Sequence, residues 1–140
     1  NTYKLTYEST AKEIFKGHFI NPEYVRWELH RVWVVEATLK PGKRHIYPRR
    51  VFYLDEDSWA GLASDEYDAR GNMYRTGLAY LTQSYDILAP VTDPYGLYDL
   101  ITGQYTLGLY TAQTGGKKLN APKYPQRSWT PDSLAGSGVR

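Results

Sequence analysis

The first clear pattern along the chain is an alternation of apolar and polar residues, which is typical of a half-buried β-strand. In the stretch 25–39 it begins at Val25, Trp27 and Leu29 and then becomes a continuous apolar run. A strand covered on both faces, or a bulge near Arg31, produces such a change. The sequence therefore predicts a first strand over 25–39.

Further strand patterns follow, separated by turn residues such as the Lys-Pro-Gly-Lys run at 40–43. Pro90 and Pro94 argue against regular structure between 88 and 94, because proline cannot donate to a sheet ladder. The remaining strands are predicted at 49–54, 59–68, 73–81, 97–101 and 104–110. Together they predict a mainly β fold, an antiparallel meander with little helix.

The two ends of the chain have weaker patterns. Residues 1–24 form an approach segment with one helical turn over 11–15, capped by Ser9-Thr10. Residues 112–140 predict an extended arm that ends in a short helix, because Thr130-Pro131 has the residue types of a helix start. The length suits one domain, so residues 1–140 are predicted to be a single β-rich domain.

Composition narrows the class of protein. The chain is 41% hydrophobic and 23% charged, which is ordinary for a globular protein, and its net charge of +2 gives no reason to expect a nucleic-acid partner. There is no cysteine, which excludes disulfides and thiolate chemistry. The unusual quantity is the aromatic fraction of 15%, with 14 Tyr and 4 Trp, which favours strands and part-apolar surfaces.

Motifs for catalysis are absent from the sequence, including GxSxG, HExxH and the phosphate-binding loop. Glu28 and His30 are two residues apart and could share a metal, but a solvated or hydrogen-bonded strand histidine is the favoured interpretation. A hydrolase that uses Asp55 or Asp65 with a histidine is the weakest hypothesis. We therefore expect no enzyme, no catalytic residues, no metal and no cofactor.

A basic stretch at 40–50 contains Lys43, Arg44, Arg49 and Arg50. These side chains could bind a phosphate or an anionic lipid headgroup. The alternative is a solvated hairpin loop whose charges protect a sheet edge.

Aromatic and aliphatic residues on the predicted strands form the second candidate site. Their ordinary role is a packed core, and their functional role would be the concave face of a curved sheet that holds a hydrophobic ligand. The candidate residues for this face are Trp27, Trp33, Phe52, Leu54, Tyr74, Leu78 and Tyr80.

Two long strings are recognisable: WELHRVWVVEATLKPGKRHIYPRRVFYLDEDSW at 27–59 and YDARGNMYRTG at 67–77, with WTPDSL near the end. They resemble the C-terminal part of a domain-of-unknown-function family of Gram-negative envelope proteins, described as outer-membrane lipoprotein-sorting-like. Family members are considerably longer. The resemblance implies that this chain is the C-terminal portion of an open antiparallel half-barrel, located in the periplasm or at the periplasmic face of the outer membrane.

Two functions follow from the resemblance. The first is a binding or carrier protein for a lipid or other hydrophobic ligand. The second is a structural or interaction module of the envelope that docks another protein, or the missing N-terminal part of the same chain.

Overall fold

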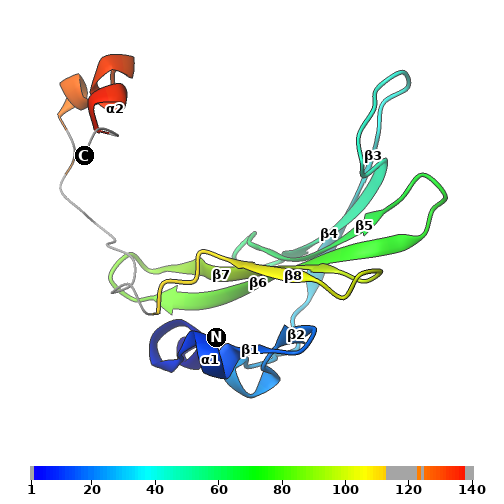
Figure 1. The fold of residues 1–140 in the computed structure, drawn as a ribbon, viewed down its shortest axis with the longest axis horizontal. Helices are drawn as coiled ribbons and strands as arrows, with labels where there is room; N and C mark the ends of the chain where they lie inside the picture. The colour runs from blue at the N-terminus through cyan, green and yellow to red at the C-terminus, as the bar shows by residue number, and fades with distance from the viewer. Residues whose placement is uncertain (1, 113–122, 124, 138–140) are drawn as a thin grey trace.

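The computed structural model describes residues 2–112, 123 and 125–137. Its main element is an antiparallel sheet in the order β3-β4-β5-β6-β7-β8 (Figure 1). Each of these strands pairs only with its neighbours in sequence, so the described sheet stays open, with β3 and β8 as its edges. The predicted mainly β, open antiparallel meander is confirmed. The strands are β3 (Val32–Thr38), β4 (Arg49–Asp55), β5 (Gly61–Tyr67), β6 (Met73–Ser84), β7 (Ala89–Asp99) and β8 (Tyr105–Gly108).

The N-terminal segment packs along one face of this sheet (Figure 1). Leu5, Ile14 and Ile20 are buried together with Tyr80 of β6, so the hydrophobic core lies between this segment and the sheet. The predicted helical turn is present and has a capping box, in which the backbone N–H of Thr10 donates to the Glu13 carboxylate. The segment consists of η1 (Lys4–Glu8), α1 (Ala11–Ile14), β1 (Phe15–Lys16), β2 (Phe19–Ile20) and η2 (Pro22–Tyr24).

Hydrogen bonds also fix the N-terminal segment to the sheet. The backbone N–H and the hydroxyl of Thr2 both donate to the carbonyl of Leu81, at 3.0 and 3.1 Å. The buried hydroxyl of Thr6 donates to the carbonyl of Asp93 at 2.6 Å. Because these bonds reach β6 and β7, the segment is part of the fold and not merely an approach to it.

The strand register assigns side chains to two faces of the sheet. Tyr53, Ala63 and Leu78 are consecutive partners across β4, β5 and β6, so they share a face. We call this the covered face, because Leu78 packs against the N-terminal core. Phe52 alternates with Tyr53 and lies on the opposite face, which we call the open face.

The strand predicted over 25–39 is wrong in its first half. Residues 25–31 are outside the sheet, and β3 begins only at Val32. We call 25–31 the crossing segment, because it leads from η2 to β3 across the strands. β3 itself is an edge strand with six of its seven residues exposed, so it is not covered on both faces. The apolar alternation at the start of this stretch does not mark a buried side of the crossing segment, because Trp27 is 65% exposed and Leu29 is fully exposed.

The expected break at 88–94 is also wrong, since β7 runs through Pro90 and Pro94. The reason is that β8 pairs only with residues 95–98 of β7. The first half of β7 is therefore hydrogen-bonded to β6 alone, and proline is tolerated on such an edge.

The predicted terminal helix is confirmed as α2 (Pro131–Ser137), which follows η3 (Gln126–Ser128). The Thr130 hydroxyl accepts the N–H of Ser133 at 3.2 Å, as expected of a helix cap. Much of the predicted arm, at 113–122, 124 and 138–140, lies outside the described residues. Within the described part of the chain, no helix has the length and apolar character needed to cross a membrane.

Candidate functional site

The crossing segment lies over the covered face and borders a half-open cavity of about 510 Å³ against β5 and β6. Its apolar wall comes from both sides of this space, with Trp27 from the segment and Leu62, Leu78 and Tyr80 from the sheet. Its polar wall contains Glu28, His30, Asp55 and Ser58. We call this space the larger cavity.

A second space, the smaller cavity, has a volume of about 420 Å³. The β1–β2 hairpin supplies Phe19 and Ile20, and the sheet supplies Leu78, Tyr80 and Tyr98.

The two cavities meet at one aromatic contact. Both are lined by Val25, Trp27, Leu78 and Tyr80. The ring of Trp27 lies edge-on to the ring of Tyr80, with 6.5 Å between their centroids. The two spaces therefore adjoin at the Trp27–Tyr80 contact. Each is within the size range of small-molecule pockets, and their shared wall is apolar.

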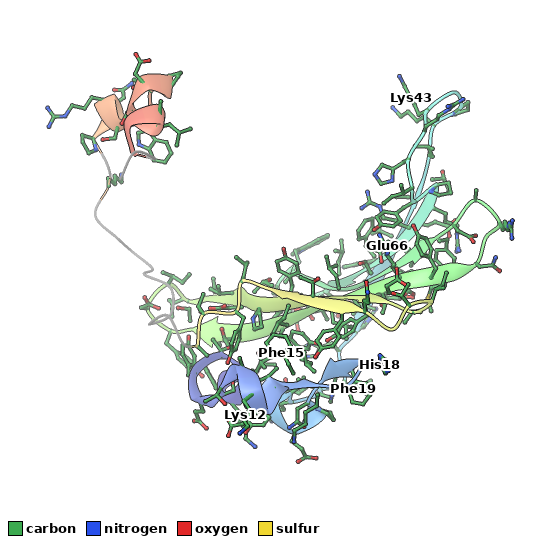
Figure 2. The ribbon with its side chains drawn as sticks, viewed as in Figure 1. Lys12, Phe15, His18, Phe19, Lys43 and Glu66 are labelled. Atoms are coloured by element: carbon green, nitrogen blue, oxygen red, sulfur yellow. The ribbon has the colours of Figure 1, made fainter. Side chains whose placement is uncertain are left out.

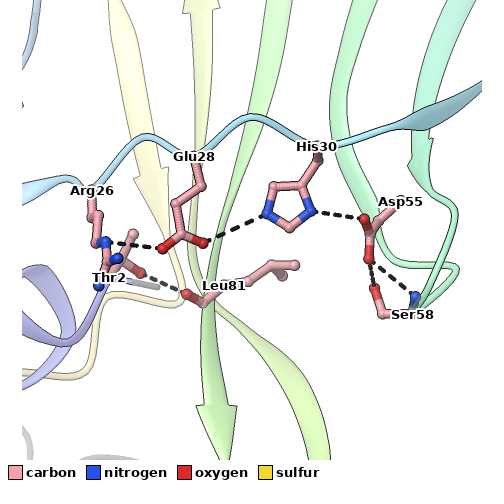
Figure 3. A network of polar contacts seen from close by, with 7 residues as sticks. All are labelled: Thr2, Arg26, Glu28, His30, Asp55, Ser58 and Leu81. Atoms are coloured by element: carbon pink, nitrogen blue, oxygen red, sulfur yellow. Dashed lines mark hydrogen bonds and ion pairs between the residues drawn. The ribbon is translucent and has the colours of Figure 1, made fainter.

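A chain of polar contacts holds the crossing segment at the larger cavity (Figure 3). Nε of Arg26 lies 2.9 Å from the carboxylate of Glu28, whose other oxygen lies 3.6 Å from Nε2 of His30. Nδ1 of His30 lies 2.9 Å from Oδ1 of Asp55. The hydroxyl and the backbone N–H of Ser58 both donate to Oδ2 of Asp55, at 2.5 and 3.0 Å.

Asp55 is the buried member of this chain, with 6% of its surface exposed. Its pKa is lowered, first by the hydroxyl of Ser58 and also by the Ser58 N–H and by His30, although burial opposes the shift. Asp55 is therefore a carboxylate at neutral pH.

The order of contacts is serine, aspartate, histidine. A nucleophilic serine must instead contact the imidazole that takes its proton. In this network the Ser58 hydroxyl donates to Asp55, so the geometry does not activate it. Within the described residues no group of three or more His, Asp or Glu side chains could hold a metal ion.

The structure separates the residues predicted for one hydrophobic face. Trp27, Leu78 and Tyr80 come together around the two cavities. Phe52 instead borders a shallow depression of about 200 Å³ on the open face. Leu54 is the register partner of Trp33 there.

Two more aromatic residues of the predicted set, Trp33 and Tyr74, line neither cavity. The ring of Trp33 stacks on that of Trp59, with centroids 6.4 Å apart. The hydroxyl of Tyr74 donates to the carbonyl of Ile46 at 3.1 Å, which directs Tyr74 to the β3–β4 connection.

The four basic residues predicted for a headgroup do not line either cavity. Lys43 is at the tip of the β3–β4 hairpin, next to Arg44, and remote from the N-terminal segment (Figure 2). Arg49 makes a two-pronged contact with the carboxylate of Glu36, at 2.9 and 3.2 Å. The guanidinium of Arg50 lies 5.2 Å from the ring centroid of Phe52. Anion binding by this stretch stays a prediction, and it concerns a surface apart from the cavities.

Sequence reasoning missed Tyr98, which lines the smaller cavity. The signal was present in Gly96-Leu97-Tyr98, because a glycine two positions before an aromatic residue leaves space on the same face of a strand.

Residues 1–135 match the model of the family described as "Protein of unknown function (DUF1329)". The chain belongs to this family. The family membership predicted from the two sequence strings is therefore confirmed. The chain is also similar to an uncharacterized protein of Pseudomonas aeruginosa, with 42% identity over 142 residues. That match covers 100% of the chain and 31% of the relative, so the chain spans about a third of the relative's length.

Two solved structures are also similar to the chain. One is a DUF1329 family protein from Desulfovibrio piger, with 19% identity and a TM-score of 0.47 over 54% of this chain and 31% of that one. The other is a putative outer membrane lipoprotein-sorting protein domain from Vibrio parahaemolyticus. It has 20% identity and a TM-score of 0.45, over 64% of this chain and 39% of that one.

Proposed function

We propose that this chain provides the ligand-binding part of a carrier or binding protein for a lipid or other hydrophobic molecule in the Gram-negative envelope, in the periplasm or at the periplasmic face of the outer membrane. The ligand lies on the covered face, beneath the crossing segment. The observation that carries the proposal is the pair of cavities, about 510 and 420 Å³, whose apolar walls meet at Trp27 and Tyr80. The sequence resemblance to lipoprotein-sorting-like envelope proteins supports the location.

The proposed mechanism is removal of apolar surface from water, without catalysis and without a cofactor. Each buried methylene contributes about 0.8 kcal/mol, so an acyl chain of ten carbons gains on the order of 8 kcal/mol before the cost of its ordering. Trp27 is suited to gate this exchange, because 65% of its surface is exposed although it lines both cavities. Rotation of this one side chain would join the two spaces.

The direct test is binding of a dye that fluoresces in apolar surroundings, such as N-phenyl-1-naphthylamine, to the purified chain. Wild type is expected to bind the dye saturably, with a fixed number of dye molecules per chain. Trp27→Ala is expected to raise the dissociation constant for the dye at least fivefold. Trp129→Ala is the matched control, since Trp129 is 77% exposed and lines neither cavity. Equal loss in both variants, or no saturable binding by wild type, would refute the proposal. Native mass spectrometry of the protein from its own cells, followed by lipid extraction, would then identify the ligand class.

A second function, docking of another envelope protein, is favoured by the open face. Trp33, Trp59 and Leu97 are each at least half exposed there, and Val35 is 43% exposed. Adjoining apolar residues of this kind are common at protein interfaces. If docking is the function, the chain self-associates in analytical ultracentrifugation, and Trp33→Ser with Trp59→Ser makes it monomeric. A wild-type chain that is monomeric and binds the dye favours the carrier.

A further inference from the structure

Two tyrosine hydroxyls meet at the wall of the smaller cavity. The oxygen of Tyr80 lies 2.6 Å from the oxygen of Tyr98, and both residues line the cavity. Tyr80 is buried, with 3% of its surface exposed, and it also lines the larger cavity. The pair therefore places polar atoms at a point where the surroundings are otherwise mostly apolar.

The two hydroxyls cannot use both of their O–H donors on each other. Two hydroxyls carry two O–H donors, and the bond between them uses one. Among the residues that the structure describes, neither hydroxyl makes a second hydrogen bond. One O–H therefore has no acceptor in the described protein. This O–H lies at the wall of the smaller cavity, where a ligand oxygen could accept its hydrogen bond.

The position of Tyr98 depends on its neighbours. A Cβ atom placed on Gly96 would lie 2.7 Å from the ring and the hydroxyl oxygen of Tyr98, so this ring can lie close to the sheet only because residue 96 is glycine. The ring of Tyr105 stacks on the Tyr98 ring, with centroids 5.7 Å apart and planes within 16°. The sheet therefore holds Tyr98 with its hydroxyl against Tyr80, as a preformed polar site requires.

The charges around the pair indicate which ligand group fits. Among the described residues no Lys or Arg lines the smaller cavity. Its other ionisable groups are His18, whose Nδ1 lies 3.0 Å from the carbonyl oxygen of Gly103, and Asp99, which is bound to Arg75 at 3.0 Å. An ionised headgroup would lose its hydration here without gaining a counter-charge. Burial raises the pKa of both tyrosines, so both hydroxyls remain protonated donors at neutral pH. A neutral oxygen is the matching acceptor.

We infer that Tyr80 and Tyr98 bind the polar end of a neutral amphiphile, through a hydroxyl or carbonyl oxygen, while its apolar body fills the cavities. This inference rests on the proposed carrier function and names its ligand class. It also differs from the anionic headgroup expected from the basic stretch at 40–50. Those basic residues are not at the cavities.

The test is displacement of N-phenyl-1-naphthylamine by 1-dodecanol, compared between wild type and the double variant Tyr80→Phe with Tyr98→Phe. The double variant is needed because removal of one hydroxyl leaves the other free to donate. We expect about tenfold weaker binding of dodecanol, the effect of one hydrogen bond of roughly 1.4 kcal/mol, once the dye affinity measured for each protein is used to correct its own competition curve. Tyr105→Phe is the control and should bind dodecanol like wild type. An equal dodecanol affinity in wild type and the double variant overturns the inference.

A second measurement uses wild type alone and does not depend on the folding of the variant. With ¹³Cζ-labelled tyrosine, dodecanol should shift the NMR signals of Tyr80 and Tyr98, and 1-chlorododecane, a poor acceptor, should not. Equal shifts from both compounds would contradict the inference. If the dye itself does not bind wild type, the carrier proposal has failed. If the dye binds but these two comparisons show no difference, only the tyrosine pair is refuted.

Discussion

Nδ1 of His30 lies 2.9 Å from Oδ1 of Asp55, and this contact ties the crossing segment to the end of β4. The segment is outside the sheet, so side-chain contacts of this kind position it over the larger cavity. Because the pKa of Asp55 is lowered by Ser58 and His30, the carboxylate form of Asp55 favours the folded state.

The first prediction concerns the pH dependence of this contact. A carboxyl whose pKa is lowered in the folded protein contributes stability above its unfolded pKa of about 3.9, and this is lost as the pH falls through the folded value. Asp55→Asn should therefore destabilise the chain at pH 7, by about 1–3 kcal/mol for hydrogen bonds to a buried charge. The difference from wild type should shrink below about pH 4. Urea unfolding at several pH values measures it, and a difference that stays constant from pH 7 to pH 2 would exclude this role of Asp55.

The second prediction concerns the core under the N-terminal segment. The side chain of Leu5 is fully buried, whereas Leu29 in the crossing segment is fully exposed. Leu5→Ala should lower the free energy of unfolding by about 2–5 kcal/mol, through lost burial and the cavity left behind. Leu29→Ala makes the same chemical change and should cost less than about 0.5 kcal/mol. Denaturant unfolding compares the two. Similar losses would mean that the N-terminal segment does not form the core.

Local patterns predicted much of this fold. The strands at 49–54 and 73–81 are correct because alternation and turn residues are properties of neighbouring positions. The crossing segment was predicted as a strand because Val25, Trp27 and Leu29 alternate with polar residues, but this alternation does not mark a buried side, since Leu29 is fully exposed. The prolines of β7 were misinterpreted because the length of β8, which makes that half of β7 an edge, is set by distant residues.

The candidate site was predicted only in part for a related reason. Trp27, Leu78 and Tyr80 do lie together, but Trp33 and Phe52 lie on the other face of the sheet. Both faces of this sheet carry apolar side chains. Alternation divides the residues of one strand into two sets, but it does not show which set lies on the same face as a given set in the neighbouring strand. The strand register decides this, and it is not visible in the sequence.

The third prediction tests the fit between Gly96 and Tyr98. Gly96→Ala introduces a methyl group 2.7 Å from the Tyr98 ring, which must then move. We expect a loss of about 1–3 kcal/mol in the free energy of unfolding, as for other overpacked sites. In the Tyr98→Ala background the same change should cost much less, because the ring is gone. A double-mutant cycle measures this coupling, and additive effects would show that the two residues do not constrain each other.

The last prediction concerns Asp99, at the end of β7. The pKa of its carboxyl is lowered to about 2, first by the backbone N–H of Thr102 and then by Arg75, whose Nε lies 3.0 Å from Oδ2. Arg75→Gln should raise this pKa toward its usual range without restoring it fully, because the backbone N–H groups of Thr102 and Ile101 remain. In wild type the stabilising effect of the charged form is present above pH 4 and is lost as the pH falls toward 2. NMR titration of the side-chain carboxyl carbon reads the pKa directly. An unchanged pKa in Arg75→Gln would assign the whole shift to the turn, and a fully normal pKa would assign it to the arginine.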